Sequence, residues 1–320
     1  MKKMLYIHIG SPKTGTTAIQ EFFYVNRGSL EKAGLLYPVI DEDPFRIRTN
    51  GRFVSNKELH GKFFEAVKKT RCQRTLISEE MLFLNNHLDF LSCEELKKYD
   101  VKVICYLRNC IEYLSSLWGE RSKLFNGTWT IAPISLEEFL ADNSYASDLE
   151  NIYKLADIFG RENILIKTFE KEMFKDSGLL DDFFDALGME APGGMVSVGD
   201  RNVSPPRKNC DVINFIKSTN PGLSESEAYE RLFDLVGGDG RKIIETIDDE
   251  LIERVVARTY PIERRIAKDF LGRRELFSSK YPKVYKEERE PYAPLSNLDL
   301  KKILTFIDVN VANSKGCLIE

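Results

Sequence analysis

The stretch of this sequence best suited to chemistry is a glycine-containing turn between a predicted strand and a predicted helix. An apolar run over residues 5–9 leads into Gly10-Ser11-Pro12-Lys13-Thr14-Gly15-Thr16-Thr17. Glycine and proline bend such a turn and leave its backbone accessible. Successive N–H groups then point at one spot, where the helix N-terminus adds partial positive charge. The pattern predicts an anion cradle, and the usual anion of that size is a phosphate.

The position of the lysine sets this turn apart from the Walker A loop of nucleoside triphosphatases. Four residues separate Gly10 from Gly15, as in that loop, but Thr16 stands where the lysine would be. A triphosphatase needs its lysine on the outer phosphates and a hydroxyl on magnesium. Lys13 lies in mid-loop instead, which suits a bond that breaks just beyond a 5′-phosphate. The alternative is a strand–helix turn that binds nothing.

A second pair of possible phosphate ligands follows the most apolar predicted strand, residues 101–107. Arg108 stands at the end of this strand, and Ser116 lies about two turns into the next predicted helix, facing back. An arginine fork with a hydroxyl is a good phosphate clamp. Two phosphate sites for one adenosine describe 3′-phosphoadenosine 5′-phosphosulfate (PAPS) and not ATP. The alternative for Arg108 alone is a salt bridge.

Two carboxylates at another strand end are candidates for a general base. Residues 75–78 form a predicted strand, and Glu79 and Glu80 follow it. In an open α/β sheet, ligands bind outside the carboxyl ends of the strands. We expect Glu79 to accept the proton of an attacking hydroxyl. Glu80 is the alternative base, because an error of one residue in the predicted strand end would exchange the places of the two carboxylates. The non-catalytic alternative for Glu79 is a salt bridge or a helix cap.

The elements that must position these residues alternate between strand and helix up to about residue 190. Alternation of this kind predicts a parallel sheet with helices on both faces, an α/β fold of the three-layer P-loop NTPase-like type. The later segments look helical, at 206–218, 224–236, 248–276 and 298–309. We therefore expect a single domain over 1–277, made of a parallel-sheet core over 1–190 and a helical annex over 191–277. Residues 278–320 form a C-terminal extension.

Composition and charge narrow the class of protein. The formal net charge of −4 makes nucleic acid an improbable partner. The cysteines are scattered without a C-x-x-C pair and histidine is scarce, so neither a metal site nor a disulfide framework is expected. No stretch is apolar for long enough to insert into a membrane, and the N-terminal apolar run is short for a signal peptide. The sequence favours a soluble cytoplasmic protein and leaves its oligomeric state open.

The two phosphate motifs resemble those of the PAPS-dependent sulfotransferases. The segment Pro12-Lys13-Thr14-Gly15-Thr16-Thr17 resembles the 5′-phosphosulfate loop of that family. The stretch from Tyr106 to Trp118 resembles its 3′-phosphate motif, although Cys110 stands where proline is common. Weaker similarities to bacterial members lie at 77–79, 145–170 and 264–277, and in Arg201-Asn202-Val203-Ser204. The resemblance covers about residues 4–277.

The resemblance implies transfer of a sulfuryl group from PAPS to a hydroxyl, or less readily an amine, with adenosine 3′,5′-bisphosphate (PAP) as product and no metal. Lys13 would neutralise the bridging oxygen, and Glu79 would be the base. The residues expected to bind the nucleotide are Ser11, Pro12, Lys13, Thr14, Gly15, Thr16, Thr17, Arg108, Ser116 and Arg201. Because polysaccharide-type relatives use glutamate, the resemblance favours a carbohydrate or glycolipid acceptor. The absence of a predicted membrane anchor favours a bacterial cytoplasmic enzyme over a Golgi one. The alternatives are a P-loop nucleotide kinase or triphosphatase, and a non-catalytic nucleotide-binding scaffold.

Overall fold

The computed structural model describes most of the chain and divides it into two compact units. The described residues are 2–40, 50–84, 88–123, 134–141, 144–198, 205–219, 228–237, 240–278 and 292–316. The first unit comprises Met1–Cys110, Ser144–Asn202 and Ala257–Lys280. The second comprises Ile111–Asn143, Val203–Val256 and Tyr281–Glu320. The units are interleaved along the chain, whereas the predicted boundaries at 190 and 277 separate consecutive segments; those boundaries stay a prediction.

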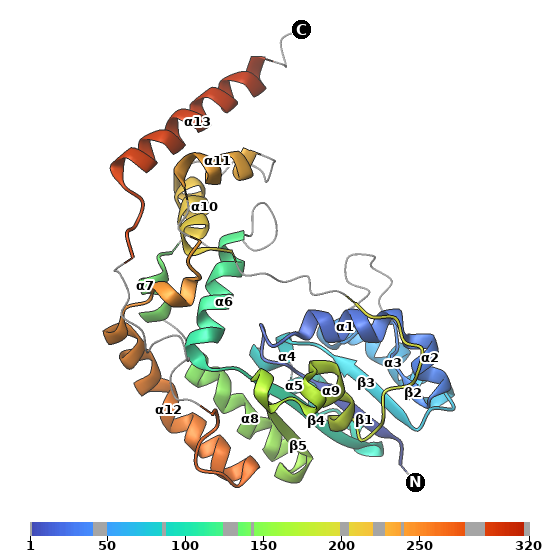
Figure 1. Ribbon diagram of the computed structural model, residues 1–320. Coiled ribbons are helices and arrows are strands. Elements are labelled where there is room, and N and C mark those ends of the chain that lie inside the picture. The colour runs from blue at the N-terminus through green and yellow to red at the C-terminus, as the bar shows by residue number, and fades with distance from the viewer. Residues whose placement is uncertain are drawn as a thin grey trace. The chain divides into compact units, whose positions relative to one another are not determined.

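A five-stranded, fully parallel sheet forms the centre of the first unit (Figure 1). Its strand order is β2-β3-β1-β4-β5. The strands are β1 Met4–His8, β2 Leu35–Leu36, β3 Arg74–Ser78, β4 Asp100–Leu107 and β5 Ile164–Thr168. Because all strands run the same way, their carboxyl ends meet at one edge, and β1 lies between β3 and β4. The predicted α/β fold with a central parallel sheet is confirmed.

The helices of the first unit lie where the sequence predicts them, with one break and several additions. They are α1 Thr16–Val25, α2 Arg27–Lys32, α3 Lys57–Lys69, α4 Met81–Leu84, α5 Leu88–Leu91, α8 Tyr145–Phe159, α9 Leu179–Ala186 and the part of α12 (Asp249–Leu271) from Ala257 on. Short 3₁₀ turns lie at Arg52–Ser55, Leu96–Lys98, Arg161–Asn163, Lys171–Met173 and Lys175–Ser177. The predicted helix after the Gly10–Thr17 turn, expected to run from Thr16 to about Leu30, is broken at Asn26. The Asn26 side chain donates to Phe22 O (2.9 Å) and to Val196 O (3.0 Å). The short helices α4, α5 and α9 were not predicted.

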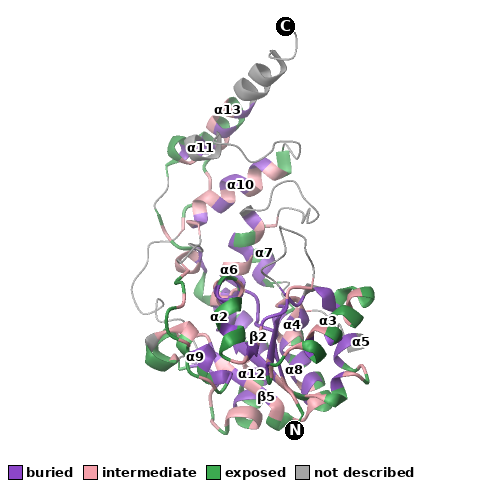
Figure 2. Cartoon of the chain, turned by 90° about the vertical axis from the view of Figure 1, so that its right-hand side faces the viewer, coloured by how far each residue is buried: buried purple, intermediate pink, exposed green. Residues whose placement is uncertain are grey.

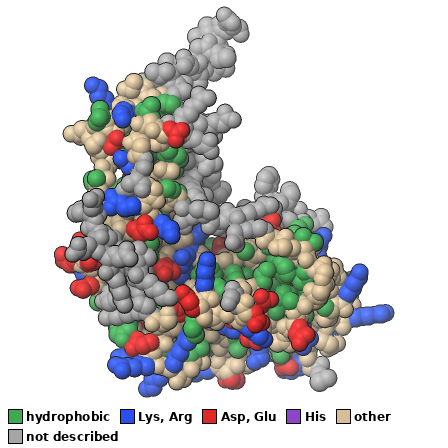
Figure 3. Space-filling model, in the orientation of Figure 1, with side chains coloured by type: hydrophobic (Ala, Val, Ile, Leu, Met, Phe, Trp, Pro, Cys, Tyr) green, Lys and Arg blue, Asp and Glu red, His purple; other side chains and the backbone are tan. Residues whose placement is uncertain are grey.

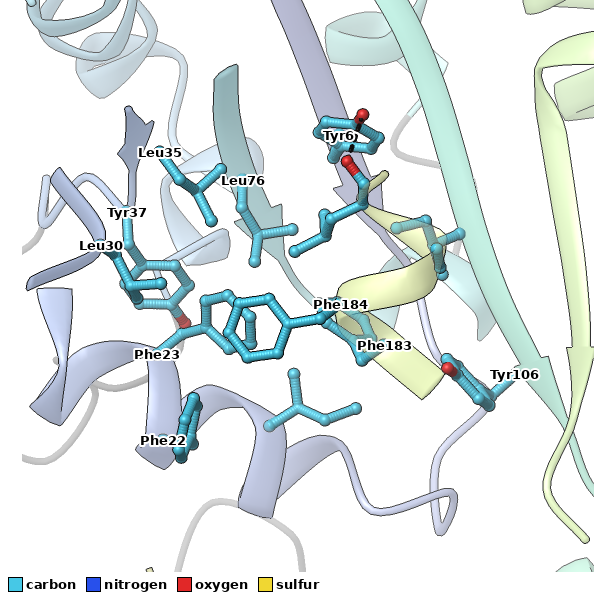
Figure 4. Packing of buried hydrophobic residues seen from close by; sticks show 14 residues of the cluster. Tyr6, Phe22, Phe23, Leu30, Leu35, Tyr37, Leu76, Tyr106, Phe183 and Phe184 are labelled. Carbon is cyan, nitrogen blue, oxygen red and sulfur yellow. Dashed lines mark hydrogen bonds between the residues drawn. The ribbon is translucent and has the colours of Figure 1, made fainter. Parts of the chain in front are cut away.

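One face of the sheet is covered by α1, α2 and α9 through a cluster of large side chains (Figure 4). Tyr6 and Tyr106 rise from the strands, and Phe23 of α1 meets Phe183 of α9 with ring centroids 5.3 Å apart. The sheet and these contacts are buried, as the purple strands in Figure 2 show. Burying each such aromatic side chain stabilises the fold by about 2 kcal/mol. This packing fixes where α1 starts, and therefore where the loop before it lies.

The second unit is helical in its described residues, apart from one isolated bridge between Pro206 and Lys242. Its elements are α6 Cys110–Lys123, α7 Leu136–Ala141, α10 Arg207–Thr219, α11 Ala228–Val236, a 3₁₀ turn Ile243–Thr246, the first part of α12 Asp249–Leu271, and α13 Asn297–Gly316. Ser135 and Glu138 form a capping box before α7, a pattern that the sequence S-x-x-E predicts. Glu138 N–H donates to Ser135 Oγ (3.1 Å), and Ser135 N–H donates to Glu138 Oε2 (3.2 Å). The helix predicted to reach residue 276 ends at Leu271, because Gly272 (φ +63°) turns the chain out of it.

Positive and negative side chains are interspersed on the face shown in Figure 3. In the described part of the chain, no helix has the length and apolar character needed to cross a membrane. The same residues contain no group of three or more His, Cys, Asp or Glu side chains that could hold a metal ion.

Candidate active site

The loop between β1 and α1 is held in a strained backbone conformation. Gly10 (φ +53°), Lys13 (φ +68°) and Gly15 (φ +76°) all adopt left-handed conformations. For a lysine this costs about 1–2 kcal/mol, and strain of this kind clusters at ligand-binding sites. The loop is anchored, since Ser11 N–H donates to Tyr106 O (2.8 Å) and Thr14 Oγ1 donates to Ser11 O (2.6 Å). The structure thus anchors this loop at the carboxyl edge of the sheet, and its role as an anion cradle stays a prediction.

We predict that replacing Gly15 by alanine destabilises the protein. A Cβ at this position would lie 2.4 Å from Leu179 Cδ2 and 3.3 Å from the ring of Phe169, and the left-handed backbone disfavours any side chain. The expected loss in the free energy of unfolding is roughly 2–4 kcal/mol. Gly28→Ala is the control, because nothing lies within 4 Å of the new Cβ in α2. Urea unfolding should show Gly28→Ala at least as stable as the wild type; equal stabilities for both variants would contradict the prediction.

The start of α1 offers backbone donors that no side chain of the helix satisfies. Gly15 is its N-cap without a side-chain hydrogen bond, and the first turn carries no acidic residue. Helix starts of this kind stabilise anions. The Ser11 hydroxyl nearby is buried without a hydrogen-bond partner. Thr17 is exposed, whereas the buried Thr16 donates its hydroxyl to Glu80 Oε2 (2.5 Å).

Arg108 joins the end of β4 to this loop. Its Nη1 donates to the backbone carbonyl of Lys13 (3.0 Å), and its guanidinium lies 5.5 Å from the centre of the Phe169 ring. Tyr145, at the start of α8, donates its hydroxyl to Arg108 O (2.8 Å). The structure therefore brings Arg108 and Lys13 together, as a shared site requires. Ser116 is a half-buried residue of α6 in the second unit, and its phosphate contact stays a prediction.

The two candidate bases at the end of β3 occupy different environments. Glu79 is 4% exposed, and its Oε1 accepts the N–H of Met81 (3.0 Å), which is the capping role weighed against catalysis. Glu80 reaches the loop through Thr16. A Cβ on Gly10 would lie 3.7 Å from the Cβ of Glu80, so this residue also packs against the loop backbone. The side chain of Glu80 thus contacts the β1–α1 loop.

His8 is a core residue. It is fully buried, its Nδ1 is hydrogen-bonded to Ser78 Oγ (2.9 Å), and its ring meets Phe183 edge-on at 5.0 Å. Burial lowers the pKa of His8 from 6.5 to about 3, so the ring is neutral in the folded protein. A neutral imidazole with this pKa is a poor acceptor for a substrate proton at pH 7.

We predict that His8 makes the protein sensitive to acid. Its folded pKa lies below that of an unfolded histidine, so unfolding takes up a proton. The neutral His8 ring therefore costs no stability above pH 6.5. Between pH 6.5 and pH 3 the free energy of unfolding falls by about 1.4 kcal/mol for each pH unit. The His8→Asn variant is expected to be less stable at pH 7. Its free energy of unfolding should fall with decreasing pH less steeply than that of the wild type, by about 1.4 kcal/mol per pH unit. Urea unfolding at pH 7, 6 and 5 measures both slopes, and identical slopes would contradict the prediction.

Some predicted site residues lie outside the described part of the chain, and some contacts were not predicted. Arg201 and the Asn202-Val203-Ser204 segment that follows it belong to the undescribed residues. The packing of Phe169 and Leu179 beside Gly15 was missed. Phe169 follows β5 directly, so its place at the same strand edge was the available signal. The start of α9 carried no comparable signal.

Comparisons with known proteins give structural matches only. No family model and no curated protein matches the chain. The fold is similar to that of a sulfotransferase from Alicyclobacillus acidocaldarius (14% identity, 82% of this chain and 93% of that chain, TM-score 0.43). The fold is also similar to that of mouse sulfotransferase SULT7A1 complexed with PAP (16% identity, 84% of this chain and 90% of that chain, TM-score 0.43). A third match is the sulfotransferase domain from the curacin biosynthetic pathway (13% identity, 96% of this chain and 98% of that chain, TM-score 0.36).

Proposed function

We propose that this chain is a sulfotransferase that moves a sulfuryl group from PAPS to an acceptor hydroxyl and releases PAP. The observation that carries the proposal is the backbone of Lys13. This lysine is held in a left-handed conformation in the middle of the β1–α1 loop, and Arg108 binds its carbonyl oxygen. A triphosphatase loop would place its lysine after the second glycine. A lysine in mid-loop would instead bring its cation over the middle of the cradle, where a 5′-phosphosulfate has the bond to be broken.

Different residues of the β1–α1 loop would bind different groups at the 5′ end of PAPS. The backbone N–H groups of residues 14–17 would hold the 5′-phosphate, with the exposed Thr17 hydroxyl and the unpartnered Ser11 hydroxyl beside them. The Lys13 ammonium would neutralise charge on the oxygen between sulfur and phosphorus as that bond breaks. The reaction takes its cation from this lysine, so the proposal includes no metal ion.

The 3′-phosphate would bind to Arg108, Ser116 and Arg201. A guanidinium presents its N–H donors in a planar fork that matches the geometry of a phosphate. Arg108 would hold the 3′-phosphate while its Nη1 donates to the Lys13 carbonyl. Through this link, a ligand on Arg108 also steadies the backbone that presents Lys13.

The proton of the acceptor would go to Glu80. The acceptor oxygen attacks sulfur, its O–H bond breaks toward a carboxylate, and the sulfur–oxygen bond to PAP breaks with the electron pair leaving on PAP. Glu79 was the expected base, but its buried carboxylate caps the N–H of Met81. The contact between Thr16 and Glu80 supports Glu80, because Thr16 belongs to the nucleotide loop.

The acceptor class and the setting of the enzyme rest on the sequence resemblance. We propose a carbohydrate or glycolipid hydroxyl as acceptor, in a bacterial cytoplasmic enzyme. Residues 1–277 would form the sulfotransferase domain, and residues 278–320 would extend it.

The proposal is tested by transfer of ³⁵S-labelled sulfate from PAPS to a panel of carbohydrates, glycolipid precursors, phenols and amines. Transfer to a hydroxyl acceptor is expected, and it should persist in EDTA because Lys13 supplies the cation. Failure with every acceptor, together with no binding of PAP, would refute the proposal. Binding of PAP without any transfer would favour the non-catalytic scaffold.

A further inference from the structure

The groove on the outer side of α12 in the first unit has an unusual concentration of positive charge. It has a volume of about 490 Å³ and is lined by Pro261, Arg264, Arg265, Lys268, Arg273 and Arg274. Five of these six side chains are cationic, and no acidic side chain of the described residues is among them. The chain as a whole has a net charge of −4, so this groove is a local exception.

The local fold, and not the helix alone, assembles these cations. Arg264, Arg265 and Lys268 share one side of α12, as their spacing of three and four residues requires. Gly272 (φ +63°) ends the helix, and Arg273 N–H then donates back to Ala267 O (3.2 Å). This turn carries the next two arginines over the last helical turn. Basic side chains favour the C-terminal end of a helix because of its dipole. That preference does not explain why the turn after the helix brings Arg273 and Arg274 back toward the same end.

Much of this charge is not neutralised by the protein. Arg264 and Lys268 are exposed and have no acidic partner among the described residues. The buried Nε of Arg273 has no hydrogen-bond partner. Arg274 is 82% exposed and lies 3.6 Å from Glu275, a pair worth little in water. Arg265 is paired with Glu150 and stacked 4.3 Å over the ring of Tyr153, which fixes its position beside the groove.

The groove lies away from the β1–α1 loop. In the first unit α12 packs along α8 and runs in the same direction, with Arg265 beside Glu150 and Tyr153 bonded to Asp269 (3.0 Å). Asp269 also approaches Arg161 (3.8 Å), which lies just before the start of β5. The C-terminal end of α12 is therefore directed toward the amino-terminal edge of the sheet (Figure 1). The nucleotide loop follows the carboxyl end of β1, at the opposite edge.

We propose that this groove is a second anion site, for a small molecule that carries two or more phosphate or sulfate groups. Crowded like charges repel one another, and a multivalent anion relieves that repulsion while it satisfies several guanidinium donors. The volume lies within the range of small-molecule sites and exceeds the need of a single inorganic ion. The site would be occupied by a soluble ligand and is independent of the proposed sulfotransferase activity.

Calorimetry with inorganic tripolyphosphate tests this proposal. The full-length wild type should bind it at the groove, and Arg264→Gln/Lys268→Gln should weaken that binding at least about tenfold, since two charge-assisted contacts are lost. Lys32→Gln/Lys62→Gln removes two exposed lysines of α2 and α3 and should change binding less than about twofold. Lys13→Ala should keep the groove site, which separates it from any binding at the nucleotide loop.

Three outcomes would overturn the proposal. Equal binding by the wild type and the groove variant would show that the groove holds no such anion. An equal loss in the control variant would show a general effect of net charge. Binding to phosphatidylserine vesicles without binding to tripolyphosphate would show a membrane contact instead of a small-molecule site. Thermal unfolding without ligand should be alike in the wild type and both double variants, because all four substituted side chains are exposed.

Discussion

Lys13→Ala is expected to lower the rate of sulfuryl transfer by about 100- to 1,000-fold, the usual cost of removing one group that stabilises developing charge. The loop should keep its shape, because the contact from Arg108 goes to the backbone carbonyl of residue 13 and not to the lysine side chain. Alanine also has a Cβ, so the strain of the left-handed backbone is retained. The effect should therefore appear in kcat much more than in folding.

Single-turnover transfer of labelled sulfate and thermal unfolding measure the two sides of this prediction. The matched control is Lys62→Ala, which removes one exposed lysine from α3 in the same unit. It should transfer sulfate at the wild-type rate. A Lys13→Ala enzyme that retained a tenth or more of the wild-type rate would exclude Lys13 as the group that neutralises the leaving oxygen.

Glu80→Gln is expected to lower kcat by about 100- to 10,000-fold, the usual contribution of a general base. Glutamine keeps the size of the side chain and can still accept the hydrogen bond of Thr16, but it cannot take the acceptor proton. Binding of PAP should stay near the wild-type level.

Glu79→Gln is the neighbouring comparison that separates the two carboxylates. It should keep most of the transfer rate and lose about 1 kcal/mol of stability, since the charged acceptor for the N–H of Met81 becomes a neutral one. A large loss of kcat in Glu79→Gln, with Glu80→Gln nearly unaffected, would return the base to Glu79. Michaelis–Menten analysis across pH 5–9 with one acceptor distinguishes these results.

The sequence predicts the sheet well because its strands are buried on both faces. A strand of this kind must be a short run of apolar, often β-branched residues, and 101–107 is such a run in β4. The alternation of strands and helices then implies the parallel order. The cap of α7 by Ser135 and Glu138 was also predictable, because both partners lie within one turn.

Contacts between distant segments account for what the sequence did not predict. The break at Asn26 coincides with a hydrogen bond to Val196, far along the chain, which no local pattern reveals. Likewise, α9 is short, and its Phe183 is buried only because α1 and β1 are present. Helices of this length depend on tertiary packing more than on their own propensity.

In the candidate site too, local patterns were predictable from the sequence and contacts between distant residues were not. The spacing of Gly10, Lys13 and Gly15 predicted an anion-binding turn, and the structure adds that Lys13 itself is left-handed. Arg108 was predicted as a phosphate ligand, but its bond to the Lys13 carbonyl could not be foreseen from residues 95 positions apart. The choice between Glu79 and Glu80 depended on a strand end known only to within one residue.

Calorimetric binding of PAP, compared with ATP in the presence of magnesium, tests the central claim most directly: that the β1–α1 loop and Arg108 bind a nucleotide with phosphates at both the 3′ and 5′ positions. The wild type should bind PAP at one site without magnesium, and Arg108→Ala should weaken that binding by at least about tenfold, the loss of a charge-assisted phosphate contact. ATP with magnesium should bind more weakly and remain intact. Tighter binding of ATP with magnesium-dependent hydrolysis, and no binding of PAP, would contradict the account and identify a triphosphatase.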